Sequence, residues 1–258
     1  MKIALRLLFL FFLASGFVGC AATPPKDTYV IVHGAWGGGW AFKEVDDLLT
    51  ADGNKVYRPT LTGQGEKSNL TSLDIDLDTH ITDITNVILW ENLHDVVLVG
   101  HSYGGMVITG VADRVPDRIK CLIYLDALLP ENGESFNTAA HGAVSNSLRL
   151  NTDRDGYILY NNFDVTDRPL PHDVPMPPKT FSQPIVLKNQ DAVKKIPATY
   201  VQFTLTFAPF YDRAAARGWN MMTLDSDHNA QWSHPQQLAA LLEKAAAMMT
   251  TPTGGAAK

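Results

Sequence analysis

Ser102 lies in the part of the sequence whose residue types and spacing are best suited to chemistry. Residues 96–106 read VVLVGHSYGGM, an apolar run followed by Gly-x-Ser-x-Gly and then by a helix-like run. Glycines on both sides of a serine allow a sharp strand-to-helix turn, which exposes the hydroxyl at the N-terminus of the helix. The helix dipole and free N–H groups stabilise negative charge there. This pattern predicts that Ser102 is a nucleophile, with an ordinary glycine-rich turn as the alternative.

A serine nucleophile needs a general base, which in this arrangement follows the serine along the chain. His228 meets the requirement, because it lies in the loop between the last expected strand and the last expected helix. The other histidines precede or adjoin Ser102, lie in a proline-rich segment, or begin the last helix (His33, His80, His94, His101, His141, His172 and His234). We therefore expect His228 to take the proton of Ser102.

A glycine-rich loop, residues 33–40, directly follows the apolar run at residues 28–32. Such a loop brings backbone N–H groups close to a carbonyl under attack, so we expect the N–H groups of Ala35 and Tyr103 to form an oxyanion hole. Phosphate binding is the rival use of a glycine-rich loop, but the Lys-Ser/Thr ending of a P-loop is absent here. His33 and His101 are expected to hold these loops in place.

Apolar runs alternate with helix-like segments along most of the chain. Strands are expected at 28–32, 55–57, 95–99, 119–125, 198–207 and 220–224, and helices at 43–51, 79–90, 105–114, 212–217 and 235–249. This alternation predicts an α/β fold with a mostly parallel central sheet covered by helices on both faces. The alternation lapses at about 131–195, where prolines cluster, and we expect a cap of short helices and loops there, inserted after the strand that ends at Asp126.

Three segments together resemble the α/β-hydrolases of the plant methylesterase and hydroxynitrile lyase group and their bacterial esterase relatives. They are residues 33–36, 100–106 and 228–235, and the resemblance extends over most of the chain. It implies the α/β-hydrolase fold, a serine nucleophile, no cofactor and no metal, and the hydrolysis of carboxylic esters. Hydroxynitrile lyases of this type carry Thr and Lys where this chain has Gly34 and Asn229, so the pattern favours the esterase branch.

The resemblance also leads us to expect an acidic residue after the strand at 198–207, but residues 202–209 contain no carboxylate and Thr206 occupies the usual position. A catalytic histidine needs a partner that fixes its tautomer. Asp126 offers a replacement, because it ends the strand at 119–125 at the edge where open α/β sheets build their sites. Asp126 is therefore the expected acid, with Asp212 as second choice and Asp227 as third.

Residues 1–19 resemble a bacterial lipoprotein signal peptide. Two cations precede an apolar run, Leu7–Val18, which is shorter than the roughly 20 residues that cross a bilayer as a helix. The resemblance implies that Cys20 carries lipid and anchors the protein in the membrane of the bacterial cell envelope, on the periplasmic or outer-membrane side. Ordinary secretory cleavage near Gly19 or Ala22, and thus a secreted protein, is the alternative.

The remaining boundaries follow from these segments. Residues 20–27 are expected to form a tether, residues 28–250 one hydrolase domain and residues 251–258 a flexible tail. The second of the two cysteines, Cys121, lies in an apolar run and is expected to be a buried core residue.

Composition excludes several classes of protein. The 258 residues carry 21 Lys and Arg against 27 Asp and Glu, and 45% are hydrophobic, which excludes disordered and collagen-like chains and gives no support to nucleic-acid binding. We expect a small to medium hydrophobic ester as substrate; the residues favour no particular oligomeric state. Other α/β-hydrolase chemistry, such as a lyase reaction, and a non-catalytic surface-anchored binding module are the alternatives.

Overall fold

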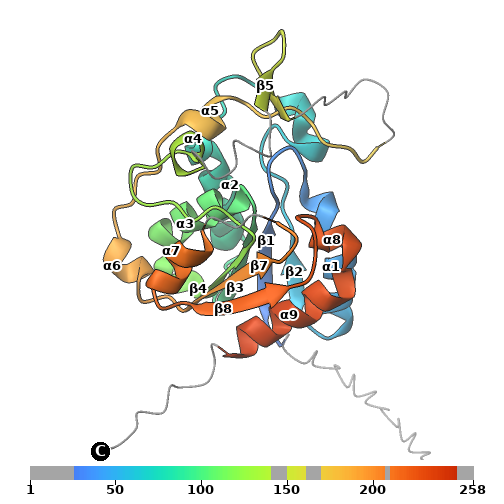
Figure 1. Ribbon diagram of the computed structural model, residues 1–258, viewed down its shortest axis with the longest axis vertical. Helices are drawn as coiled ribbons and strands as arrows, with labels where there is room; N and C mark the ends of the chain where they lie inside the picture. Colours follow the sequence, from blue (N-terminus) through green and yellow to red (C-terminus); the bar gives the residue numbers. More distant parts are fainter. Residues whose placement is uncertain (1–25, 141–149, 161–169, 207–209, 249–258) are drawn as a thin grey trace, which may run out of the picture.

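The computed structural model describes residues 26–140, 150–160, 170–206 and 210–248 (Figure 1). The expected signal peptide, Cys20 and the expected C-terminal tail lie outside these residues, as does His141. Among the described residues, none of the helices has the length and apolar character needed to cross a membrane.

Six parallel strands form the central sheet in the order β2-β1-β3-β4-β7-β8. They are β1 (Thr28–Val32), β2 (Lys55–Tyr57), β3 (Val96–His101), β4 (Ile119–Leu125), β7 (Ala198–Phe203) and β8 (Asn220–Leu224). The chain places β2 on one side of β1 and all later strands on the other. The loops that follow β1 and β3 therefore meet where the strand order reverses, which is where open α/β sheets bind ligands.

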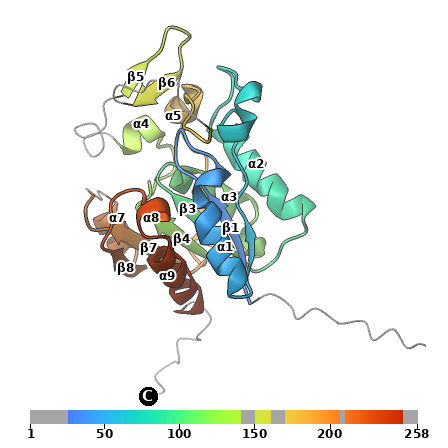
Figure 2. The same cartoon turned by 90° about the vertical axis from the view of Figure 1, so that its right-hand side faces the viewer.

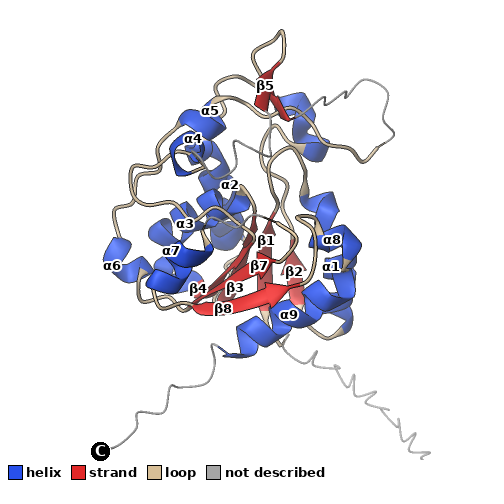
Figure 3. Ribbon diagram, in the orientation of Figure 1, coloured by secondary structure: helices blue, strands red, loops and turns tan. Residues whose placement is uncertain are grey.

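Helices cover both faces of this sheet (Figure 3). α1 (Lys43–Ala51) and α9 (Pro235–Met248) pack on one face, and α2 (Leu77–Trp90), α3 (Gly104–Arg114) and α7 (Tyr211–Ala216) lie on the other. Short helices complete the chain at η1 (Gly39–Phe42), η2 (Gly65–Leu70), η3 (Pro116–Arg118) and α8 (Ala230–Ser233). The predicted α/β architecture is thus confirmed, with every strand of the central sheet parallel.

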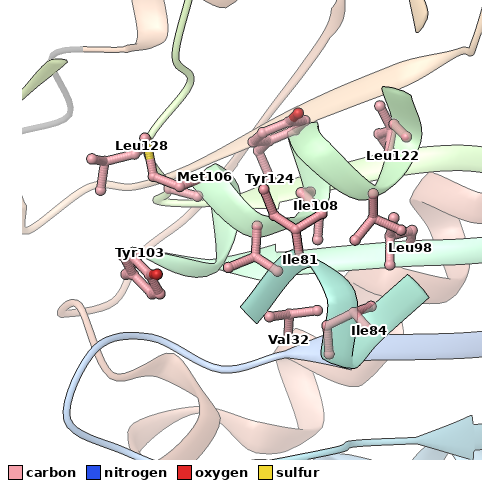
Figure 4. Packing of buried hydrophobic residues seen from close by; sticks show 14 of the residues in the cluster. Val32, Ile81, Ile84, Leu98, Tyr103, Met106, Ile108, Leu122, Tyr124 and Leu128 are labelled. Carbon is pink, nitrogen blue, oxygen red and sulfur yellow. The ribbon is translucent and has the colours of Figure 1, made fainter. Parts of the chain in front are cut away.

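Alternation of side chains along the strands explains the two layers. Tyr29 and Ile31 pack in the core under α1 and α9, whereas Val30 and Val32 pack in the core under α2 and α3. Successive residues of a strand point to opposite faces, so a strand that is apolar throughout fills both cores. Figure 4 shows residues of the core under α2 and α3, among them Val32 and Leu98 of the strands and Ile81 of α2.

Several boundaries differ from those expected, and two of these differences have a clear physical cause. α2 begins at Leu77 rather than at 79, because Asp76 caps it: the carboxylate accepts the N–H of Thr79 at 2.9 Å. β7 ends at Phe203 rather than at 207, because the chain turns there and the N–H of Thr206 donates to the carbonyl of Phe203. The second difference brings Thr206 back toward the end of β4.

The segment between β4 and β7, predicted as a cap, consists of short elements. These are α4 (Phe136–Ala139), an antiparallel pair of β5 (Leu150–Thr152) and β6 (Ile158–Tyr160), α5 (Lys179–Ser182) and α6 (Gln190–Val193). Figures 1 and 2 both show α4, α5 and the β5–β6 pair together at one end of the molecule. α6 instead lies beside α3. The β5–β6 pair was not expected from the sequence.

Candidate active site

Ser102 sits on a tight turn between β3 and α3. It adopts a positive φ of 52°, which is strained for a residue with a side chain. Its N–H donates to the carbonyl of Leu125 (3.2 Å), and its own carbonyl accepts the N–H of Leu128 (3.0 Å). A Cβ atom at Gly104 would lie 2.5 Å from the carbonyl oxygen of Val32. The glycines thus allow β1, β3 and α3 to approach closely around the serine.

His228 and Asp126 form a direct contact. The Nδ1 atom of His228 lies 2.6 Å from Oδ2 of Asp126, whose side chain is only 4% exposed. An ionised carboxylate only accepts hydrogen bonds, so Nδ1 of the neutral imidazole carries the proton and Nε2 is left as the base. Asp126 has a φ of 43°, so it too adopts the left-handed conformation at the end of its strand.

Thr206 provides the second contact to this carboxylate. Its Oγ1 lies 2.9 Å from Oδ1 of Asp126 and 2.7 Å from the carbonyl oxygen of Phe203. A hydroxyl has one hydrogen and both neighbours are acceptors, so the two compete for the same proton. Thr206, which occupies the position where a carboxylate was expected, therefore contacts the carboxylate of Asp126.

The other two candidate acids lie away from this contact. Asp212 is exposed on α7, and neither it nor Asp227 has a hydrogen bond or ion pair with His228 among the described residues. Asp227 instead accepts the N–H of Asn229 (2.9 Å) and the hydroxyl of Ser233 (3.1 Å) within its own loop. Of the three carboxylates considered, the structure brings Asp126 to His228.

His101 connects the turn of Ser102 to the loop of His228. Burial lowers the pKa of His101 well below its usual value, so the imidazole is neutral and Nε2–H donates to the carbonyl oxygen of His228 at 2.8 Å. The two rings lie with centroids 4.7 Å apart. This contact fixes the backbone of the His228 loop against the strand that precedes Ser102.

His33 has a comparable place in the glycine-rich loop. Its Nε2 accepts the N–H of Leu61 (3.1 Å), so Nδ1–H donates to the carbonyl of Gly34 (2.7 Å). Burial lowers the pKa of His33 to about 4. Neutral His33 therefore ties the loop after β1 to the segment that follows β2.

Ala35 and Tyr103 lie on the two loops that flank the serine. Within the described part of the chain, neither backbone N–H donates to a protein acceptor. The Tyr103 side chain is fully buried, and its hydroxyl donates to Nδ1 of His80 at 2.9 Å because Nε2–H of His80 is used by the carbonyl of Thr62. The backbone at Tyr103 is thus anchored while its N–H remains available.

The amino-acid sequence matches a known family along most of its length. The profile of the alpha/beta hydrolase family matches residues 29–241. The chain belongs to the alpha/beta hydrolase family.

Relatives of this hydrolase include several esterases. It is 51% identical over 108 residues to the carbendazim hydrolyzing esterase of Nocardioides sp., which is 42% of this chain and 45% of that protein. It is 31% identical over 112 residues to methylesterase 2 of Arabidopsis thaliana, which is 43% of each chain. These matches therefore span less than half the length of either relative.

A solved structure resembles the hydrolase along most of its length. The crystal structure of a methylesterase from Arabidopsis covers 86% of this chain and 99% of that chain, with a TM-score of 0.68 and 25% sequence identity.

The hydrolase has a cavity of about 250 Å³ at these residues. Ser102 and His228 both line it, together with Ala35 of the glycine-rich loop. Aromatic walls come from Trp36, Phe42, Tyr160 and Trp232. Trp232 stacks on Trp40 with ring centroids 5.7 Å apart, which joins the His228 loop to the glycine-rich loop.

The sequence did not predict three polar side chains that line the cavity. Asp173, Asn229 and Gln231 line it alongside the aromatic residues. Asp173 lies in a proline-rich stretch with no motif, so its place depends entirely on how the segment before α5 folds. In the described residues, no group of three or more His, Cys, Asp or Glu side chains is arranged to hold a metal ion.

Proposed function

We propose that this hydrolase cleaves carboxylic esters, with Ser102 as nucleophile, His228 as general base and Asp126 as the acid that supports the histidine. The 2.6 Å contact between His228 Nδ1 and Asp126 Oδ2, beside a cavity that Ser102 and His228 share, carries the proposal. The sequence similarity to a carbendazim hydrolyzing esterase and to a methylesterase supports the same class of reaction.

The first step of the proposed reaction acylates the enzyme. Nε2 of His228 removes the proton of Ser102 as Oγ attacks the ester carbonyl, and the N–H groups of Ala35 and Tyr103 stabilise the oxyanion. The tetrahedral intermediate then collapses: the bond to the alkoxy group breaks, and the leaving oxygen takes the proton from His228. The alcohol departs and the acyl group remains on Ser102.

The second step regenerates the serine. Water loses a proton to His228 and attacks the acyl carbonyl, and the bond to Ser102 breaks as the proton returns to Oγ. In both steps Asp126 stabilises the imidazolium and keeps the histidine in the tautomer that it needs. The cavity volume of about 250 Å³ supports small esters as substrates.

Covalent labelling of Ser102 tests this function. A fluorophosphonate should phosphonylate the wild-type protein at Ser102, and Ser102→Ala should remain unlabelled. The wild type should also release nitrophenol from a p-nitrophenyl acyl ester and leave a cyanohydrin intact. An unlabelled Ser102 in the folded protein, with no ester turnover, would refute the proposal and favour a non-catalytic binding module.

We propose further that the chain is exported and anchored by lipid on Cys20. The support is the sequence alone, in which a charged start and an apolar run lead to a cysteine. The same hypothesis implies that residues 1–19 are removed, that residues 20–27 form a tether and that the protein lies in the bacterial cell envelope. Mass spectrometry of the N-terminal peptide checks it, because a peptide that starts elsewhere or lacks acyl chains on Cys20 contradicts the anchor.

A further inference from the structure

Asp173 places a carboxylate in the wall of the cavity that Ser102 lines. Its Oδ2 accepts a hydrogen bond from the hydroxyl of Tyr160 at 2.7 Å, which fixes the orientation of the carboxylate. Its other oxygen accepts no hydrogen bond from any described residue. Asp126 does not line the cavity, and no described lysine or arginine does. Asp173 is therefore a carboxylate held in position, with one of its two oxygens unpaired among the described residues.

The other titratable groups in this wall do not offset that charge. Burial lowers the pKa of His33 to about 4 and that of His101 well below its usual value, so both imidazoles are neutral near pH 7. His228 is paired with Asp126, which balances the imidazolium whenever it forms. The described lining of the cavity thus has one fixed negative charge, that of Asp173.

Aromatic rings stand next to this carboxylate. Trp36 and Tyr160 both line the cavity, with ring centroids 4.7 Å apart. The indole N–H of Trp36 donates to the carbonyl of Ile158 at 2.9 Å, which holds the two rings together. Faces of such rings attract cations, most strongly where water is displaced. A carboxylate beside aromatic rings is the usual chemistry of a site for an ammonium group.

We propose that the cavity selects esters that carry a positively charged amine or quaternary ammonium group, bound by Asp173 with Trp36 and Tyr160. The cleavage of such esters rests on the proposed function, whereas the binding of the cation does not. Ser102 and Asp173 line one cavity of about 250 Å³, so the cation and the ester carbonyl must belong to one small molecule. The substrate class becomes small cationic esters rather than purely hydrophobic ones.

Two acetate esters of the same shape separate charge from size. Choline acetate has a quaternary nitrogen where 3,3-dimethylbutyl acetate has a quaternary carbon. We expect wild-type kcat/KM to be at least tenfold higher for the cationic ester. Asp173→Asn should bring this ratio close to one through a loss on the cationic ester, with little change on the neutral ester. Asp155→Asn removes an exposed carboxylate that does not line the cavity and should leave the ratio unchanged.

Binding to Ser102→Ala provides a measurement without catalysis. Titration calorimetry should show that choline binds at least tenfold more tightly than 3,3-dimethyl-1-butanol. Choline should also bind more weakly at high salt than at low salt. Adding Asp173→Asn should remove the difference. Equal or tighter binding of the neutral alcohol, or a preference for choline that survives Asp173→Asn, overturns the inference. Failure of the proposed function is recognised separately, as an unlabelled Ser102 in a protein that still binds choline.

Discussion

At the residue scale, Asp126 and Thr206 form a hydrogen-bonded pair beside His228. Thr206 has the place at the end of β7 where the resemblance leads one to expect a carboxylate, and Asp126 follows the neighbouring β4. The Thr206 hydroxyl contacts Oδ1 of Asp126, and His228 contacts Oδ2. A buried carboxylate needs its lone pairs satisfied, because leaving them without partners is costly. The threonine thus supports the relocated acid.

Asp126→Asn is expected to lower kcat by about 10³ to 10⁴ and to leave KM little changed. The amide can donate to Nδ1 and so favours the wrong tautomer of His228, and it no longer balances the imidazolium. Steady-state hydrolysis of a p-nitrophenyl ester measures both constants. A folded variant with near-normal kcat contradicts the role given to Asp126.

Three further variants complete this experiment. Asp212→Asn changes an exposed carboxylate on α7 and should keep wild-type kcat, whereas a large loss there would transfer the role of acid to Asp212. Thr206→Val removes one hydrogen bond to Asp126 and should lower kcat by about fivefold, the effect of roughly 1 kcal/mol for a single hydrogen bond. Thr206→Ser keeps the hydroxyl and should restore most of the activity.

At the scale of elements, the start of α3 is pressed against the loop that follows β4. Ser102 exchanges backbone hydrogen bonds with Leu125 and Leu128. A Cβ atom at Gly105 would lie 2.0 Å from the carbonyl oxygen of Leu128. The element that carries the serine and the one that carries Asp126 are therefore in backbone contact, which fixes the two side chains relative to one another.

Gly105→Ala should consequently separate these two elements. We expect a loss of about 1–3 kcal/mol in the free energy of unfolding, as for other overpacked sites, and a larger loss of ester hydrolysis because the serine moves relative to its base. Urea unfolding and the rate of fluorophosphonate labelling measure the two effects. Gly37→Ala is the control for the free energy of unfolding, because its Cβ would meet nothing closer than 3.9 Å. Equal behaviour of the two variants would contradict this account.

At the scale of the whole molecule, three buried histidines hold the loops around the site. His33, His80 and His101 come from three separate segments of the chain, and each bonds to backbone or side-chain groups of another segment. Burial lowers the pKa of His33 and of His80 to about 4, and that of His101 well below 6.5. All three are therefore neutral in the folded protein at pH values where an unfolded chain protonates its histidines.

The free energy of unfolding should therefore fall as the pH drops from about 6.5 toward 4. In that range the unfolded chain binds protons that the folded chain does not, so stability rises with pH. Each such histidine accounts for about 2 kcal/mol between pH 7 and pH 5. Urea unfolding at the two pH values measures the difference. His80→Gln should reduce it, and His94→Gln, on the exposed surface, should not. Equal stability at pH 7 and pH 5 would count against neutral buried histidines.

Local patterns along the chain were enough to predict much of this molecule. The alternation of apolar runs and helical segments predicted the α/β fold, and the bounds of β1, β2, β4 and β8 agree with those expected. Ser102 and His228 became candidates because each lies in a short segment whose own residues specify a turn or a loop after a strand. Such patterns need only neighbours in the sequence, so they can be read without the fold.

Contacts between distant segments could not be obtained in this way. Three carboxylates were candidates for the partner of His228, and the choice depends on β4 lying beside β7, where the N–H of Asp126 donates to the carbonyl of Val201 at 2.8 Å. β7 ends at Phe203, and this early end turns Thr206 toward Asp126. The sequence did not predict it, because the strand-like pattern continues to residue 207. Asp173 likewise carries no motif.

The sequence by itself determined the layers of the fold and the residue types at the two loops around Ser102, since periodicity and glycine spacing act over a few residues. Only the tertiary structure decided which carboxylate reaches His228 and that a second one, Asp173, lines the cavity. Both depend on strand order and on the packing of the segment between β4 and β7. Those are set by the burial of surfaces far apart in the chain, and no short stretch of residues encodes them.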